Sequence, residues 1–136
     1  MQGKEQKILL VWVTNPEAAG RIADTGRRLA DETGSELRIV SIQNPIHNET
    51  WENTLSDLEQ LHHAARSVQA DLTVVYSDNR FEAAVKLIRE IAPSAMVAGV
   101  SGDLSRNLFL EHIRTYNREV PIYIVDSAGN TLKLTE

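Results

Sequence analysis

The sequence predicts an α/β fold in which one parallel β-sheet carries helices on both of its faces. Five short apolar segments of strand character alternate with four longer segments whose apolar residues recur at helical spacing. Strict alternation with short connections is typical of a parallel sheet, because each connection must cross back over the sheet before the next strand starts. The 136 residues suffice for one domain, which we assign to residues 1–136 with a core at 7–126.

The first strand is expected at 7–13, an almost continuous apolar run of the kind that is buried on both faces of a parallel sheet. The helix after it is expected to begin near Asn15, a capping residue, and Pro16, which suits a first turn because its missing N–H is no loss there. Apolar residues then recur at helical spacing over 19–30. Gly34 is expected to end this helix, because glycine tolerates a positive φ.

A second strand is expected at 36–42, followed by a second amphipathic helix. One stripe of that helix, at steps of three and four, is expected to pack on the sheet: Trp51, Leu55, Leu58, His62, Ala65 and Val68. His62 would then lie on the apolar side of the helix. Trp12 in the first strand and Trp51 in this helix are expected to be core residues rather than surfaces for stacking.

The remaining core elements follow the same alternation. They are a strand at 71–76, a helix that starts after the capping residues 77–79 and stops before Pro93, a strand at 95–99, a helix at 104–116 and a strand at 122–125. Pro121 is acceptable at the first residue of that last strand.

An extension at 127–136 follows the core. Residues 127–130 have turn composition, and 131–135 alternate polar and apolar side chains as a half-buried strand does. The simplest interpretation is a sixth strand that folds back antiparallel on the fifth, and the alternative is a frayed tail. A fold-back would cover the apolar edge of the fifth strand, so we expect any dimer to avoid direct pairing between two fifth strands.

A ligand site is expected at the carboxyl ends of the strands, where strand order reverses in an open parallel sheet. If the first and fourth strands flank that point, the loops that follow them form the site. The candidate ligand contacts are Thr14, Asn15, Gly99, Ser101, Gly102, Ser105 and Arg106. Glycines allow close approach of a phosphate, and a following helix N-terminus, hydroxyls and a guanidinium supply donors. The alternative is a strand-to-helix turn that only needs glycine; neither GxGxxG nor GxxxxGK[ST] occurs.

Composition and motifs exclude several functions. The net charge of −5 argues against nonspecific nucleic-acid binding, and the lack of cysteine excludes thiolate metal sites and cysteine nucleophiles. No apolar run approaches the ~20 residues that span a bilayer and no signal peptide is recognisable, so we expect no membrane insertion and a cytoplasmic protein. His62 and His63 point about 100° apart on a helix and do not suit one metal ion. With no catalytic pair evident, we expect no enzyme.

The chain resembles the universal stress protein domains. The likeness is carried by residues 7–13, 29–31, 34–37, 97–99 and 120–125, and it extends over 7–126. It implies a Rossmann-like, five-stranded parallel sheet of order 3-2-1-4-5, adenine-nucleotide binding in some members, and frequent dimerisation through the fifth strand.

The first forty-five residues are most similar to the version of this domain found inside Kdp-type potassium-sensor histidine kinases of bacteria. There, too, a small polar loop precedes a proline, as Thr14 and Asn15 precede Pro16, and a polar pair precedes proline at 43–45. The kinase-type domains can bind a cyclic dinucleotide through small hydroxyls after the first strand and an aromatic residue near the end of the second. Thr14 and Asn15 fit the first requirement, but Ser41 stands where the aromatic residue is expected.

Members that bind ATP carry the motif G-x2-G-x9-G-[ST]. Gly99 and Gly102 match its first two glycines, but His112 and Ile113 stand at the final pair. An aspartate commonly closes the first strand in those members, and residues 13–15 of this chain offer none. We therefore expect binding of ATP, AMP or a cyclic dinucleotide to be weak.

Together these features predict a non-catalytic regulatory or sensor domain that acts in stress response or signalling. A homodimer and a signalling protein are its expected partners. The alternative is a ligand-free interaction or dimerisation module. A nucleotide hydrolase is a third reading, and it requires the phosphate loop that this sequence lacks.

Overall fold

The computed structural model describes residues 7–13, 18–43, 51–99, 113, 115–116, 119–125 and 131–134. Within them, one six-stranded sheet has the order β3-β2-β1-β4-β5-β6. Its strands are β1 (Ile8–Trp12), β2 (Glu36–Gln43), β3 (Asp71–Tyr76), β4 (Ala95–Gly99), β5 (Ile122–Val125) and β6 (Thr131–Leu134). The first five are parallel, which confirms the α/β fold and the order 3-2-1-4-5.

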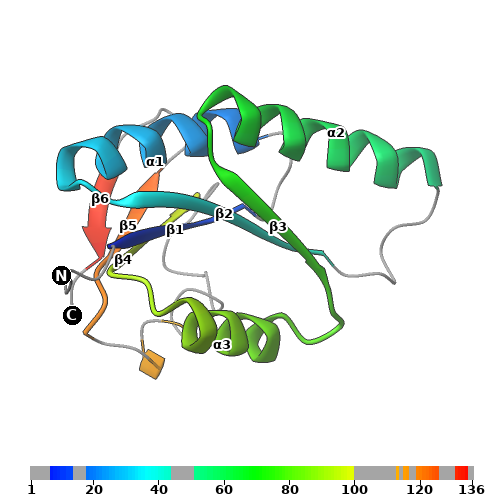
Figure 1. The fold of residues 1–136 in the computed structure, drawn as a ribbon. Helices are drawn as coiled ribbons and strands as arrows, with labels where there is room; N and C mark the ends of the chain where they lie inside the picture. The colour runs from blue at the N-terminus through cyan, green and yellow to red at the C-terminus, as the bar shows by residue number, and fades with distance from the viewer. Residues whose placement is uncertain are drawn as a thin grey trace, which may run out of the picture.

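Three described helices cover the sheet, as the ribbon shows (Figure 1). Helices α1 (Ala19–Thr33) and α2 (Trp51–Ser67) lie on one face, and α3 (Arg80–Ile91) lies on the other. Of the helix predicted at 104–116, residues 113, 115 and 116 are described and are helical, and the rest lies outside the described residues. In the part of the chain that the structure describes, no helix is long and apolar enough to cross a membrane.

The C-terminal extension forms the predicted sixth strand. β6 pairs antiparallel with β5, with Leu134 opposite Ile122 and Thr131 opposite Val125. The fold-back interpretation is therefore confirmed and the frayed tail is wrong. Because β4 pairs with β5 on its other side, both edges of β5 are occupied within one chain.

The strands at the centre of the sheet are buried on both faces, as the apolar run at 7–13 predicts. In β1, Leu9 and Val11 belong to the core under α1 and α2, while Leu10 and Trp12 belong to the core over α3. Trp12 is 3% exposed and its Nε1 donates to Met96 Sδ at 3.3 Å, so its prediction as a core residue is confirmed. The side chain of Trp51 lies outside the described residues.

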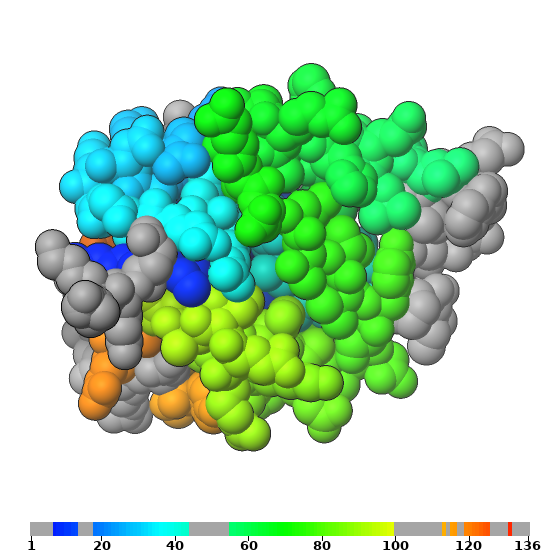
Figure 2. Space-filling view, viewed as in Figure 1, coloured from blue at the N-terminus to red at the C-terminus, as the bar shows by residue number. Residues whose placement is uncertain are grey.

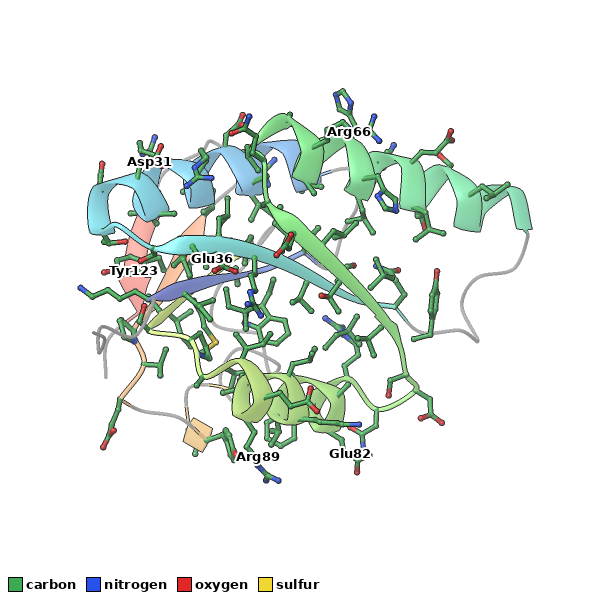
Figure 3. The ribbon with its side chains drawn as sticks, viewed as in Figure 1. Asp31, Glu36, Arg66, Glu82, Arg89 and Tyr123 are labelled. Carbon is green, nitrogen blue, oxygen red and sulfur yellow. The ribbon has the colours of Figure 1, made fainter. Side chains whose placement is uncertain are left out.

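Charged side chains gather on the outer surfaces of the helices. Arg66 on α2 points away from the sheet on one side of the molecule, and Glu82 and Arg89 on α3 do so on the other (Figure 3). In the space-filling view, atoms of α1, α2, β3 and α3 form most of the visible coloured surface (Figure 2). The polar residues of the helical pattern thus form an outer shell around two apolar layers.

The two ends of α1 differ in how far they test the prediction. The N-cap of the described helix is Ala18, which makes no side-chain capping bond. Asn15 and Pro16, where the sequence places the start, lie outside the described residues, so that start stays a prediction. At the other end Gly34 has a φ of 69° and its N–H donates to Ala30 O, as predicted.

Helix α3 begins and ends as the sequence indicates. Asn79 is its N-cap, and its Oδ1 accepts a hydrogen bond of 3.0 Å from Glu82 N. The helix ends at Ile91, two residues before Pro93. One of the three predicted capping residues therefore performs that role.

The stripe predicted for α2 is partly wrong. Among the described side chains of α2, Leu61, Ala64 and Ala65 are buried. The prediction is confirmed for Ala65 and for Val68 just after the helix, Leu58 is half-buried, and His62 and Leu55 are exposed. In the ribbon, the first turns of α2 extend past β3, so they have no strand beneath them (Figure 1). A helix that extends past its sheet can leave part of its apolar stripe in solvent, whatever the periodicity.

Candidate functional site

The candidate site lies where β1 and β4 are neighbours. They pair in parallel, with Trp12 opposite Ala98 near their carboxyl ends. From β1 the chain continues towards β2 and β3, and from β4 it continues in the opposite direction, to β5 and β6. The carboxyl ends of β1 and β4 therefore form the topological switch point at which open α/β sheets bind ligands. The sequence analysis placed the site here on the condition that the first and fourth strands are neighbours at the point where strand order reverses, and they are.

Gly99 is the described member of the predicted contact set. It is the last residue of β4 and lies opposite Val125 of β5. The other members lie outside the described residues: Thr14, Asn15, Ser101, Gly102, Ser105 and Arg106. Their gathering into one site therefore stays a prediction.

Gly99 lacks a side chain for a reason that involves α1. A Cβ atom at this position would come within 2.7 Å of Ile22 Cγ1 and closer still to Ile22 Cδ1. The Ile22 side chain thus occupies the space over the end of β4. Glycine is required here by packing, whether or not a ligand also uses the free space near its backbone.

The ends of β1 and β2 are held by paired backbone groups. Val13 N donates to Val40 O at 2.9 Å, and Ser77 N donates to Gln43 O at 2.9 Å. Near the end of β2, Ser41 is fully buried and its Oγ accepts a hydrogen bond from Gln43 Nε2. The position at which the resemblance called for an aromatic residue thus holds a buried, engaged hydroxyl.

Sequence reasoning missed Arg21, which lies in the first turns of α1 directly before Ile22. In the parts of the chain that the structure describes, its Nε is the buried side-chain nitrogen or oxygen atom without a hydrogen-bond partner. Its place in the sequence could have indicated it, because Arg21 is a cationic residue soon after the loop that follows the first strand and stands next to the core residue Ile22.

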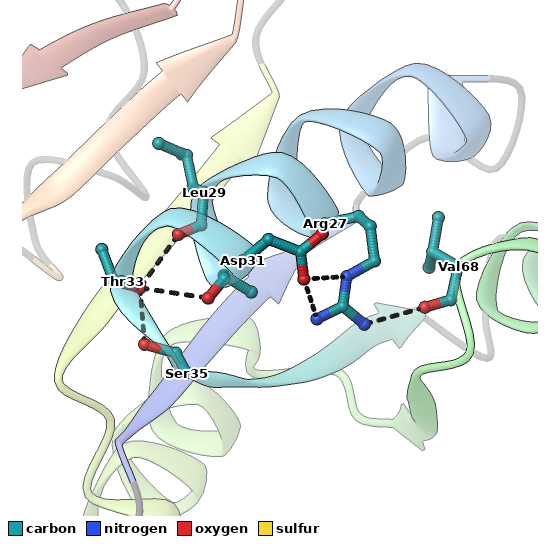
Figure 4. A network of polar contacts seen from close by, with 7 residues as sticks. Arg27, Leu29, Asp31, Thr33, Ser35 and Val68 are labelled. Carbon is teal, nitrogen blue, oxygen red and sulfur yellow. Dashed lines mark hydrogen bonds and ion pairs between the residues drawn. The ribbon is translucent and has the colours of Figure 1, made fainter.

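Arg27, near the middle of α1, is partly exposed and makes polar contacts in two directions. Its guanidinium contacts Asp31 Oδ1 at 2.8 Å through Nη2, and its Nη1 donates to Val68 O at 3.0 Å (Figure 4). Val68 directly follows α2, so Arg27 ties the end of that helix to α1. Arg28, one position further, is exposed.

Two further groups of polar side chains lie away from the switch point, at the end of α1 and on α2. Thr33 Oγ1 donates to Leu29 O at 2.9 Å and lies 2.7 Å from Ser35 Oγ, which closes the C-terminal turn of α1 (Figure 4). His62 and His63 are both exposed on α2. Among the described residues, no group of three histidine or acidic side chains is placed to hold a metal ion.

Comparison with known proteins gives similarity in structure and not in sequence. No family model and no curated protein matches this sequence. A universal stress protein solved in complex with cAMP is 16% identical, with a TM-score of 0.59 over 91% of this chain and 99% of that one.

Two further structures of this family are similar. A universal stress protein family member from Burkholderia pseudomallei is 18% identical, with a TM-score of 0.62 over 91% of this chain and 98% of its own. The universal stress protein from Archaeoglobus fulgidus in complex with dAMP is 15% identical, with a TM-score of 0.60 over 88% of this chain and 97% of its own. The closer likeness to the kinase-type domain stays a prediction. These identities establish architecture, and the chain has the fold of the universal stress proteins.

Proposed function

We propose that this chain is a non-catalytic regulatory domain of the universal stress protein type, which binds the phosphate group of an adenine nucleotide weakly at the carboxyl ends of β1 and β4. The observation that carries the proposal is the switch point between these two strands. Two proteins of the same fold were solved with cAMP and with dAMP, which supports an adenine nucleotide as the ligand class.

The sequence after β4 supplies the expected phosphate contacts. Gly102 allows backbone approach, and Ser101, Ser105 and Arg106 are potential donors to phosphate oxygens. The final glycine–hydroxyl pair of the ATP-binding motif is replaced by His112 and Ile113. Each lost charge-assisted hydrogen bond costs roughly 1.5–3 kcal/mol, and two such losses would turn micromolar affinity for ATP into about millimolar.

We propose a non-catalytic role because His112 and Ile113 replace the final glycine–hydroxyl pair of the motif. Hydrolysis of ATP requires that the β- and γ-phosphates be held in place, and the residues that would hold them are missing from the motif. The domain would therefore signal by occupancy, in the cytoplasm, through a homodimer or a signalling partner. A kinase-type setting would add a cyclic dinucleotide as a candidate ligand.

Calorimetric and thermal-shift titrations with AMP, ATP, cAMP, a cyclic dinucleotide and adenosine test this proposal. A ligand present at 100 times its Kd stabilises the folded state by about 2.7 kcal/mol. We expect AMP to stabilise the protein and adenosine to do so less. Arg106→Ala should weaken AMP binding, and Arg66→Ala, on the outer surface of α2, serves as the matched control.

Two results would overturn parts of the proposal. Low-micromolar binding of ATP would contradict the weak affinity, and turnover of ATP would contradict the non-catalytic role. A protein that binds none of these compounds would leave the second candidate, a ligand-free interaction module.

That second candidate is favoured by exposed apolar side chains on α2 and β3. Leu55 on α2 is 42% exposed and Tyr76, at the end of the outer strand β3, is 44% exposed. Gly99 is also explained by packing without a ligand. Concentration-dependent sedimentation distinguishes the two candidates: an interaction module should self-associate or capture a partner in the absence of nucleotide.

A further inference from the structure

We propose that Arg21 donates from its guanidinium to the phosphate group of the ligand at the switch point. This inference rests on the proposed function and adds to it a residue from α1. The predicted contacts otherwise follow the strands β1 and β4, so Arg21 would close the site from the helix that packs above them.

The Arg21 side chain carries a buried hydrogen-bond donor. Its Nε is buried, and in the described parts of the chain it is the buried side-chain polar atom without a hydrogen-bond partner. A buried N–H that has lost water without gaining an acceptor is unfavourable, and more so on a charged group. Most buried polar groups are paired, so an exception beside a candidate site points to an acceptor that the described part of the chain does not supply.

The contrast with two other arginines supports this reading. Arg27 contacts the carboxylate of Asp31 at 2.8 Å, and Arg38 Nε contacts Glu36 Oε2 at 2.8 Å. Both sites pair the guanidinium with a nearby acid on the same element. In the described part of the chain, by contrast, the Nε of Arg21 has no hydrogen-bond partner.

Arg21 lies in the first turn of α1, beside the buried face of that helix. Arg21 directly precedes Ile22, whose side chain lies over Gly99 at the end of β4. Arg27 directly follows Gly26, which packs against Val11 of β1, and Arg27 reaches Val68 beside α2. The two arginines therefore flank the buried stripe of the helix on opposite sides.

Because Arg27 takes the side that carries α2, Arg21 takes the side of β4, which α1 also contacts. The first turns of α1 lie at the carboxyl end of β1, since this helix follows that strand. Thr25, one helical turn after Arg21, is 5% exposed, so the helix surface is covered at that position next to Arg21. Arg21 is thus the sequence neighbour of the residue that covers Gly99, the last residue of β4.

The shape of a guanidinium group suits a phosphate group. A guanidinium presents Nε–H and Nη–H side by side, and this pair matches two oxygens of a phosphate. A free Nε–H is the donor that such a side-on contact needs and that a lysine at the same position could not provide. The ligand group recognised is therefore a phosphate, carried by a nucleotide or free in solution, rather than the adenine base.

The test is AMP binding by the whole chain and by two variants, Arg21→Gln and Arg21→Lys. We expect about tenfold weaker binding of AMP by Arg21→Gln, equivalent to about 1.4 kcal/mol, with Arg21→Lys between it and the unchanged protein. Arg28→Gln is the matched control, because Arg28 lies two turns further along nearly the same side of α1 and is exposed. Adenosine binding should change in none of the variants.

A direct readout comes from the side-chain Nε–Hε resonance of Arg21 in nuclear magnetic resonance spectra. It should shift on addition of AMP and not of adenosine. A shift with inorganic phosphate alone, at similar concentration, would identify free phosphate as a sufficient ligand, while a response to AMP only would identify the nucleotide. This measurement does not require that any variant fold.

An ion pair with Glu17 is the competing explanation for Arg21. Glu17 lies four positions earlier, outside the described residues. If this pair were the purpose of Arg21, Glu17→Gln and Arg21→Gln would lose the same stability and AMP affinity would stay unchanged, which would overturn the inference. AMP binding by the unchanged protein that Arg21→Gln retains in full would overturn this inference alone. Absence of any binding of AMP or phosphate would overturn the proposed function with it.

Discussion

Helices α1 and α2 cover the same face of the sheet, but they use their apolar residues differently. In α1 the buried residues run from Ala19 to Ala30, almost the whole length of the helix. Among the side chains of α2 that the structure describes, those at 55–67, the buried ones begin at Leu61, and Leu55 is 42% exposed. Both helices show the amphipathic pattern, so periodicity identifies a helix, whereas the extent of the sheet beneath it decides how much of the pattern is buried.

The two helices also differ in how closely they approach the strands. Gly26 of α1 leaves no room for a side chain, because a Cβ there would lie 2.8 Å from Val11 Cγ2 and 3.2 Å from Leu37 Cδ1. α2 instead places Leu61, which is 1% exposed, into the same core. α1 thus approaches the strands closely because Gly26 has no side chain, whereas α2 fills the core with the large side chain of Leu61. Substitutions at these positions should therefore affect stability in different ways.

The largest effect is expected for Leu61→Ala. Truncation of a fully buried leucine removes apolar contact and leaves a cavity, at a cost of about 2–5 kcal/mol of unfolding free energy. Chemical denaturation monitored by circular dichroism measures the change. A loss below about 1 kcal/mol would mean that α2 contributes little to the core and that the contrast with Leu55 is misplaced.

A smaller loss, about 1–3 kcal/mol, is expected for Gly99→Ala. The added methyl group meets Ile22 and overpacks the contact between α1 and β4. Ile22→Val removes the Cδ1 atom that is nearest to this methyl group, so the double variant should be more stable than the sum of the single changes predicts. Additive losses in this double-mutant cycle would contradict the steric explanation for Gly99.

The sequence predicts most of this fold, because the apolar run of β1, the strand lengths and the capping residue Asn79 act locally. The buried face of α2 was mispredicted in part, because it is set by contacts with strands distant in the sequence. The same reason applies to the site. Gly99 could be named as a loop glycine, but its contact with Ile22 and the isolated Nε of Arg21 exist only once α1 is packed on the sheet.

A third prediction compares two glycines within α1. Gly20 is exposed and a Cβ there meets nothing within 4 Å, so Gly20→Ala should stabilise the protein by about 0.5–1 kcal/mol through helix propensity. Gly26→Ala gains the same propensity but places a methyl group against Val11, and we expect a net loss of about 1 kcal/mol. Thermal or urea unfolding of the pair provides the comparison. If both substitutions stabilise the protein, α1 can move away from β1 at little cost.

The smallest effect is expected for Leu55→Ala in the exposed part of α2. The side chain is 42% exposed, so its truncation should change the unfolding free energy by no more than about 0.5 kcal/mol, the usual range for surface positions. Leu61→Ala, six positions later on the same helix, is the internal reference for the same chemical change. A loss at Leu55 close to that at Leu61 would show that the first turns of α2 are covered in solution, for which self-association is the simplest cause. Because a self-associating protein becomes more stable as its concentration rises, unfolding curves at two protein concentrations would separate a hidden interface from an ordinary surface leucine.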